Sequence, residues 1–116
     1  MELIWYPKCS TCQKAYKHLK ELGIDVTLRH IVEETPSVEE LQTFIKNYDQ
    51  GIKPFFNTSG KVYKELGLKD KVKDMSVEEA CELLASNGML IKRPLLIAGN
   101  QVVVGYKKEQ YDALKG

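Results

Sequence analysis

Long hydrophobic runs, an excess of charge of one sign and abundant cysteine are all missing from this sequence. No stretch approaches the ~18 to 20 consecutive apolar residues of a membrane span, and no apolar leader follows a basic N-terminus. Acids and bases are interspersed and the formal net charge is +1, which argues against a surface dedicated to nucleic acid. We therefore expect a cytoplasmic protein that binds neither membranes nor nucleic acid directly.

Cysteine is scarce as well, with three residues in 116. This odd, small number argues against the disulfide scaffold of a secreted domain and favours a reducing compartment with one functional pair, Cys9 and Cys12. Cys81 lies on the apolar face of a predicted helix, where a free cysteine ordinarily behaves as a small hydrophobe. The chain does have 43% hydrophobic residues, enough for the core of a single domain, which we expect to be monomeric.

The cysteine pair stands where a short strand gives way to a helix. Leu3–Tyr6 is a β-type run, Pro7 breaks it, and apolar residues then recur at helical spacing. Cys9 therefore falls at a helix N-terminus, where free N–H groups, the helix dipole and the charge of Lys8 stabilise a thiolate. Cys12 lies one turn further on, on the apolar face. The sequence thus predicts an asymmetric pair, with a reachable thiolate beside a less exposed thiol.

The first third of the chain predicts a βαβ unit. A strand at 2–6 is followed by a helix at about 10–22, which stops at Gly23, and by a strand at 24–31. Two strands joined by one helix in this way are parallel. The cysteine loop then lies at the C-terminal end of the first strand, where α/β folds commonly place their chemistry.

The middle of the chain reads as helical. Ser37–Glu40 and Ser76–Glu79 have the form of capping boxes, in which the serine caps a helix and the glutamate reaches back to it. Thr58 is a further candidate cap, for a helix that stops at Gly67.

After this helical region the pattern returns to strands. Segments 95–98 and 101–104 flank Gly99–Asn100, a two-residue turn that closes a β-hairpin, and a last helix is expected at about 107–114. This order gives an α/β fold of the thioredoxin type with an all-helical insertion. The predicted division is a core at 1–34 and 89–116 and an insertion at 35–88.

Four blocks, taken together, make the sequence recognisable. They are Tyr6–Ala15, Tyr63–Leu68, Met89–Leu95 and Val104–Gly105. In these blocks, and in their order, the chain resembles the bacterial-type arsenate reductase-like (ArsC/Spx) family over essentially its whole length. The resemblance implies a thioredoxin-like fold with a helical insertion.

The resemblance also implies roles for individual residues. Cys9 matches the family's nucleophilic cysteine, Arg93 the arginine beside it, and Pro94 the proline that thioredoxin-like folds hold in cis. An arginine offers a planar, permanently charged fork that suits an oxyanion or a carboxylate such as that of glutathione. The residues we expect to contact the substrate are Lys8, Ser10, Thr11 and Pro94.

The chain departs from the arsenate-reducing members at two places. Those members carry further arginines that clamp the oxyanion, where this chain has Asn57 and the Tyr106–Lys107 region. Arg29 and Arg93 are its two arginines. Lysine does not reproduce the bidentate fork, so efficient arsenate reduction is not expected.

A thiol-disulfide oxidoreductase is the leading interpretation, with Cys9 as nucleophile and Cys12 as the resolving, catalytic partner. It needs no bound cofactor, and glutathione, thioredoxin or glutaredoxin are the expected electron donors. Its partners would be a thiol or disulfide substrate and a reductant protein.

A redox-sensing regulator is the alternative. The Spx regulators share this fold and a CxxC switch and bind the C-terminal domain of the RNA polymerase α subunit, and Gly51 falls where they have a partner-contacting glycine. A glycine in a turn usually serves backbone conformation instead. A zinc site is a weak third interpretation, because Cys81, His18 and His30 show no second paired spacing. We expect both histidines to be structural, with His18 on the outer side of its helix.

Overall fold

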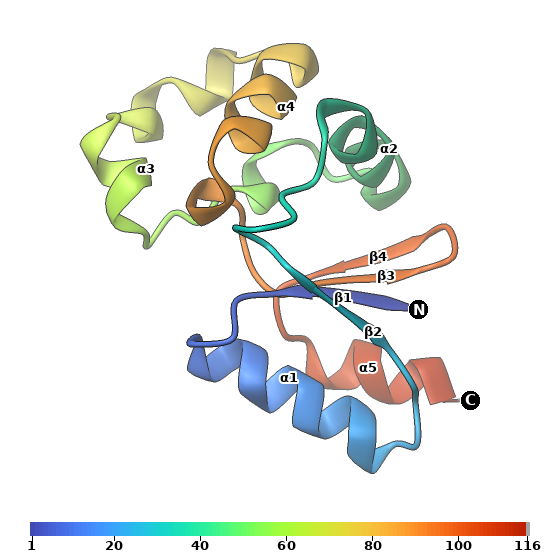
Figure 1. The fold of residues 1–116 in the computed structure, drawn as a ribbon. Helices are drawn as coiled ribbons and strands as arrows, with labels where there is room; N and C mark the ends of the chain where they lie inside the picture. The colour runs from blue at the N-terminus through green and yellow to red at the C-terminus, as the bar shows by residue number, and fades with distance from the viewer. Residues whose placement is uncertain (116) are drawn as a thin grey trace. The chain divides into compact units, whose positions relative to one another are not determined.

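The computed structural model describes residues 1–115 and divides the chain into two units (Figure 1). The first unit joins Met1–His30 to the chain from Arg93 onward, and the second is Ile31–Lys92. Cys9, Cys12 and Arg93 all belong to the first unit. The candidate site can therefore be described within this unit.

A four-stranded mixed sheet is the frame of the first unit. Its strands are β1 (Glu2–Trp5), β2 (Thr27–His30), β3 (Leu95–Ala98) and β4 (Gln101–Val104). They lie in the order β2-β1-β3-β4, with β1 parallel to β2 and antiparallel to β3, and with β3 antiparallel to β4. The predicted βαβ unit and C-terminal hairpin are confirmed.

Two helices, α1 (Ser10–Glu21) and α5 (Lys108–Lys115), cover one face of this sheet (Figure 1). Apolar residues of α1 recur every three or four positions and therefore point to the same side. The buried cluster that they form with the sheet and α5 consists of Leu3, Ala15, Leu19, Leu96, Val103 and Tyr111. This packing fixes the start of α1 against the end of β1, where the cysteines lie.

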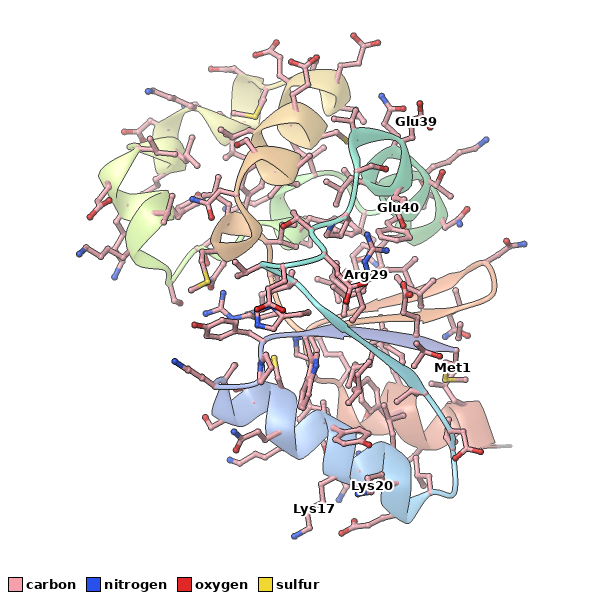
Figure 2. The ribbon with its side chains drawn as sticks, in the orientation of Figure 1. Met1, Lys17, Lys20, Arg29, Glu39 and Glu40 are labelled. Carbon is pink, nitrogen blue, oxygen red and sulfur yellow. The ribbon has the colours of Figure 1, made fainter. Side chains whose placement is uncertain are left out.

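The second strand is shorter than expected. The sequence pattern predicts a strand at 24–31, whereas β2 pairs with β1 from Thr27 to His30. It is an edge strand with one hydrogen-bonded neighbour, and Leu28 remains 36% exposed. On the same strand, Arg29 (labelled in Figure 2) forms an ion pair with Glu2 of β1, with Nη1 and Oε1 3.6 Å apart.

The second unit is helical, apart from an isolated antiparallel bridge between Phe56 and Ile91. Its helices are α2 (Val38–Tyr48), α3 (Lys61–Glu65) and α4 (Val77–Ser86). Short 3-10 turns occur at Lys53–Phe55, Leu68–Asp70, Val72–Asp74 and Gly88–Leu90. None of the helices in residues 1–115 is long and apolar enough to cross a membrane.

The predicted helix starts of this unit have different outcomes. Ser37 forms the full capping box with Glu40, as expected. Ser76 accepts from the backbone of Glu79, but the return bond to its own backbone is not made. The expectation for Thr58 is wrong, because Gly60 is the N-cap of α3 and supplies no side-chain cap.

Candidate active site

The cysteine pair occupies the first turn of α1. Cys9 is the N-cap residue, with extended backbone angles, and its N–H donates to the carbonyl of Tyr6 at 2.9 Å. Its side chain is partly exposed, whereas Cys12 is completely buried. Both thiols are free in this structure. The asymmetry expected from helix phase is therefore present.

The surroundings of Cys9 favour its thiolate. Partial burial by itself raises the pKa of Cys9, but interactions with the thiolate outweigh this effect and the pKa is lowered. The backbone N–H and thiol of Cys12 act most strongly, followed by the N–H of Thr11 and the guanidinium of Arg93. Hydrogen bonds from N–H groups of the first turn favour the charged form of the thiol, as expected at a helix N-terminus.

Cys12 shows the opposite behaviour. Desolvation by burial raises the pKa of Cys12 to about 12, and the neighbouring Cys9 adds to the increase. The backbone N–H of Tyr6 donates to Cys12 Sγ at 3.5 Å and lowers the pKa, as does Arg93, but burial outweighs both. The pKa values of the two thiols are thus shifted in opposite directions, and Cys12 is protonated at neutral pH.

Arg93 lies in the segment between the second unit and β3. The Arg93–Pro94 peptide bond is cis, as the resemblance implied, and the guanidinium lies 5.2 Å from the centre of the Tyr6 ring. Its Nε and Nη1 atoms are buried and have no hydrogen-bond partner in the part of the chain that the structure describes. Buried donors of this kind are rare in folded proteins, and an anionic group of a substrate would satisfy them.

The other expected substrate contacts fall into two groups. Lys8 precedes the first turn of α1, and Ser10 and Thr11 belong to it; all three are exposed, whereas Pro94 is buried. The carbonyl of Pro94 accepts from Gly105 at 2.8 Å, which ties the cis bond to the end of β4.

Gly51 belongs to the second unit. It is exposed, has φ of +81° and has open space where a side chain would begin. The conformation alone accounts for glycine here.

A side-chain contact that the sequence analysis missed holds the cysteine loop. Gln13 Nε2 donates to the carbonyl of Pro7 at 2.8 Å, closing the loop across the first turn of α1. The six-residue separation gives no periodic signal, so only the folded loop reveals the contact.

The expectation for His18 is wrong. Its side chain is 11% exposed and lies between α1 and the C-terminal segment, with Nε2 2.7 Å from Asp112 Oδ1 and Nδ1 2.7 Å from the Tyr106 hydroxyl. Its partners are 88 and 94 residues away in the chain, so helix phase could not indicate them. His18 is structural, as expected, but it faces inward.

Cys81 is buried on α4, where burial raises the pKa of its thiol, so it matches the expected hydrophobic role. Within residues 1–115, no group of three or more His, Cys, Asp and Glu side chains is arranged to hold a metal ion.

The buried Cys12 thiol predicts a loss of stability in alkali. Its folded-state pKa of about 12 lies above the ordinary value of ~8.5, so above that value the unfolded state binds fewer protons. The free energy of unfolding should therefore fall as pH rises, by up to about 1.4 kcal/mol per pH unit. Cys9 has a lowered pKa, and its opposite contribution is complete above ~8.5.

Urea unfolding under reducing, oxygen-free conditions between about pH 8.5 and pH 10 measures this slope. Cys12→Ser should lose the Cys12 part of it, while Cys9→Ser should keep most of it because burial is the main cause. Equal slopes in wild type and Cys12→Ser would contradict the expectation.

Comparison with known proteins places this geometry in a family. The sequence model of the ArsC family matches residues 4–114. The chain is 52% identical to the uncharacterized protein YusI of Bacillus subtilis (strain 168), over 93% of this chain and 92% of YusI. It is 35% identical to the regulatory protein MgsR of the same organism, over 87% of this chain and 79% of MgsR.

Solved structures agree. An ArsC family related protein from Bacteroides fragilis is 50% identical with a TM-score of 0.92, covering 97% of this chain and 94% of that one. A possible arsenate reductase from Streptococcus mutans UA159 is 43% identical with a TM-score of 0.88, covering 96% of both chains. With its thioredoxin-like core and helical second unit, the chain belongs to the ArsC family.

Proposed function

We propose that this protein is a thiol-disulfide oxidoreductase in which Cys9 attacks and Cys12 resolves. The observation that carries the proposal is the partly exposed Cys9 thiol at the N-terminus of α1, one turn before the buried Cys12. A nucleophilic cysteine must be both deprotonated and reachable, and a resolving cysteine must be held close to it.

The first step is attack of the Cys9 thiolate on a substrate disulfide. A bond forms between Cys9 Sγ and one substrate sulfur, the substrate disulfide breaks, and the second substrate sulfur leaves as a thiolate. Arg93 can pair with a carboxylate of the substrate or offset the negative charge, since two of its N–H donors are unused within residues 1–115.

The second step follows from the coupling of the two thiols. The charge of Cys9 is one cause of the raised pKa of Cys12, and this charge disappears once Cys9 is part of a mixed disulfide. Cys12 then loses its proton more readily and attacks Cys9 Sγ. The products are an intramolecular disulfide and a second substrate thiolate. The proposed order is therefore attack by Cys9 first and by Cys12 second.

The disulfide must be reduced by an external dithiol or by two molecules of a monothiol to complete the cycle. Glutathione, thioredoxin and glutaredoxin are the proposed donors. An arsenic oxyanion is a less suitable oxidant than a disulfide, because the Tyr106–Lys107 region stands where arsenate-reducing members carry a clamping arginine, and the Tyr106 hydroxyl is 2.7 Å from His18 Nδ1. Arg93 would remain as the bidentate partner.

Mapping the product of mild oxidation tests this proposal. Treatment of the reduced protein with oxidised glutathione, followed by proteolysis and mass spectrometry, should yield a Cys9–Cys12 disulfide, with Cys81 unmodified because it is buried. Titration in glutathione buffers gives the potential of the pair. A stable glutathione adduct on wild-type Cys9, with no Cys9–Cys12 disulfide, would rule out the resolving role.

A redox-sensing regulator is the second candidate. The observation in its favour is the 35% identity to the regulatory protein MgsR. In this case the same pair would act as a switch, and exposed Gly51 would contact the C-terminal domain of the RNA polymerase α subunit. Binding of that isolated domain should then differ between the reduced and oxidised protein. The absence of binding in both states would remove this candidate.

A further inference from the structure

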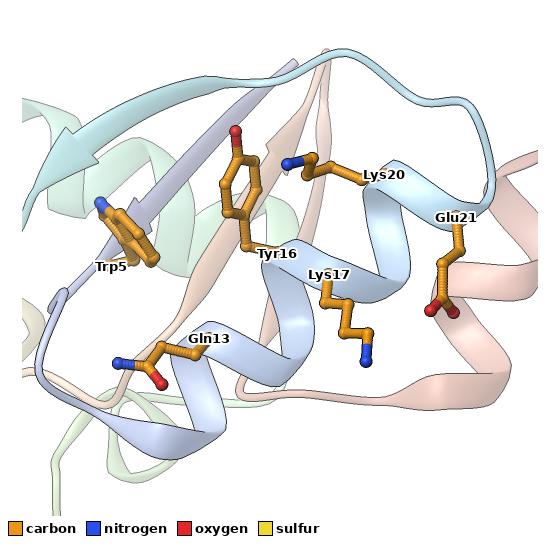
Figure 3. A pocket seen from close by; sticks show the side chains of 6 residues that line it. All are labelled: Trp5, Gln13, Tyr16, Lys17, Lys20 and Glu21. Atoms are coloured by element: carbon orange, nitrogen blue, oxygen red, sulfur yellow. The ribbon is translucent and has the colours of Figure 1, made fainter.

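A pocket of about 420 Å³ lies beside α1, apart from the thiols (Figure 3). Its lining residues come from the end of β1 and from one side of α1, and they are Trp5, Gln13, Tyr16, Lys17, Lys20 and Glu21. The volume falls within the range of ~300 to 1,000 Å³ that is typical of small-molecule sites. All six residues belong to the first unit, so the pocket is a feature of that unit.

Two aromatic rings provide its apolar wall. Trp5 and Tyr16 stand edge to face with their centroids 5.4 Å apart, and both are partly exposed while packing against the core cluster under α1. Figure 3 shows the Tyr16 ring projecting from α1 and the Trp5 ring at the end of β1. Rings anchored in this way present a rigid surface to a second planar group, which gains from burial and from offset or edge-to-face contact.

Two lysines also line the pocket, and Figure 3 shows Lys20 directed toward Tyr16 and Lys17 extending away from the two rings. Lys17 and Lys20 are exposed on α1, where both are labelled in Figure 2, and Glu21 is the single acidic residue of the lining. The ammonium of Lys20 lies 5.1 Å from the centre of the Tyr16 ring. Lys17 forms no ion pair within residues 1–115, so its charge is available to a ligand.

This charge selects among aromatic ligands. Aromatic walls often bind organic cations, but here Lys20 already takes that position over Tyr16 and Lys17 would repel a second cation. A neutral aromatic ligand would form no ionic contact with Lys17 or Lys20. An anionic group attached to a ring would meet the ammonium of Lys20 while the ring contacts Trp5 and Tyr16, and rotation of the exposed Lys17 side chain would bring a second ammonium to it.

We propose that this pocket binds a small aromatic anion, such as an aryl carboxylate, sulfonate or phosphate. The ring lies against Trp5 and Tyr16, and the acid group is bound by Lys17 and Lys20. Gln13 forms the end of the pocket nearest the cysteine loop. The site does not depend on thiol chemistry, so Cys9→Ser should bind the same ligand.

Intrinsic fluorescence tests the proposal directly, because Trp5 is the one tryptophan of the chain. The probes are 8-anilinonaphthalene-1-sulfonate and N-phenyl-1-naphthylamine, which share a ring system and differ by the sulfonate. The sulfonate should quench Trp5 saturably with one site, and it should bind about fivefold or more tightly than the neutral amine at low salt. Lys17→Gln combined with Lys20→Gln should remove this preference.

Lys14→Gln is the matched control, since Lys14 is an exposed lysine of the same helix that does not line the pocket. It should retain the preference for the sulfonate. The proposal is overturned if quenching does not saturate, if the neutral amine binds equally well, or if Lys14→Gln weakens binding as much as the double variant. Substitutions at these exposed positions should leave folding intact, which circular dichroism checks.

Discussion

Cys9→Ser should reduce the reaction with an aromatic disulfide such as 5,5′-dithiobis(2-nitrobenzoate) to background at neutral pH, a loss of roughly a thousandfold or more. The physical reason is that a serine hydroxyl is not ionised near neutral pH, whereas Cys9 has a lowered pKa at the start of α1. Cys12 should not replace it, because it is buried and its pKa is raised to about 12.

Cys12→Ser should stop the reaction halfway. Cys9 still attacks, so one aromatic thiolate is released and the other half of the reagent stays on the protein as a mixed disulfide. The wild type should release two thiolates and end as an intramolecular disulfide. Absorbance of the released aromatic thiolate gives the number of thiolates released per protein, and intact-protein mass spectrometry identifies the trapped adduct.

Cys81→Ser provides the control for these counts. Cys81 is buried within the second unit, so its loss should leave the rapid release of two thiolates unchanged. If rapid release survives Cys9→Ser and is lost in Cys12→Ser, the proposed roles of the pair are reversed.

Arg93→Met should slow the reaction of Cys9 by about two- to fivefold below neutral pH and move its pH profile to higher pH. The guanidinium is one of the groups that lower the pKa of Cys9, so its removal leaves a smaller fraction of thiolate at a given pH. Alkylation with iodoacetamide, followed as a function of pH, measures the profile without involving Cys12 or a charged substrate.

The stability of Arg93→Met should respond differently from its reactivity. Loss of the contact with Tyr6 is unfavourable, but removal of two buried donors without protein partners is favourable. We expect the two effects to leave the free energy of unfolding within about 1 kcal/mol of the wild type. A variant that reacts slowly yet unfolds normally separates a role in the site from a role in the fold.

Two further variants test whether the position and shape of the guanidinium cause the shift in the pH profile of Cys9. Arg93→Lys keeps the charge but not the planar fork, so it should restore part of the rate. Lys92→Met removes a neighbouring exposed charge and should leave the profile in place. An identical shift in Lys92→Met would show that net charge, rather than the position of the guanidinium, controls Cys9.

Much of the fold could be predicted because its signals are local. The apolar spacing after Pro7 gives α1, and Gly99–Asn100 marks the turn between β3 and β4. Ser37 with Glu40 predicts the start of α2 through contacts three residues apart. Such features are determined by near neighbours, so a single sequence contains them. The prediction that Thr58 caps a helix is wrong, because Gly60, two residues later, is the N-cap of α3.

Other parts of the site had no local signal. The inward position of His18 depends on Asp112 and Tyr106, which α5 and its preceding segment bring to α1. The pocket needs Trp5 of β1 beside Tyr16, and it forms only when the helix packs on the sheet. The exposure of Leu28 depends on β2 being an edge strand. Periodicity identifies the face of a helix or strand but not what covers it.

The sequence by itself determined the fold class, the family resemblance and the asymmetry of Cys9 and Cys12, because each depends on residue type and close spacing along the chain. The resemblance placed Arg93 beside Cys9, but only the tertiary structure decided which contacts Arg93 makes. Pairing of β1 with β3 brings together two segments about ninety residues apart in the chain. As a result, Arg93 stands over Tyr6 with unpartnered donors among the described residues. The free energy of such contacts comes from burial and charge in three dimensions, which neighbouring residues do not encode.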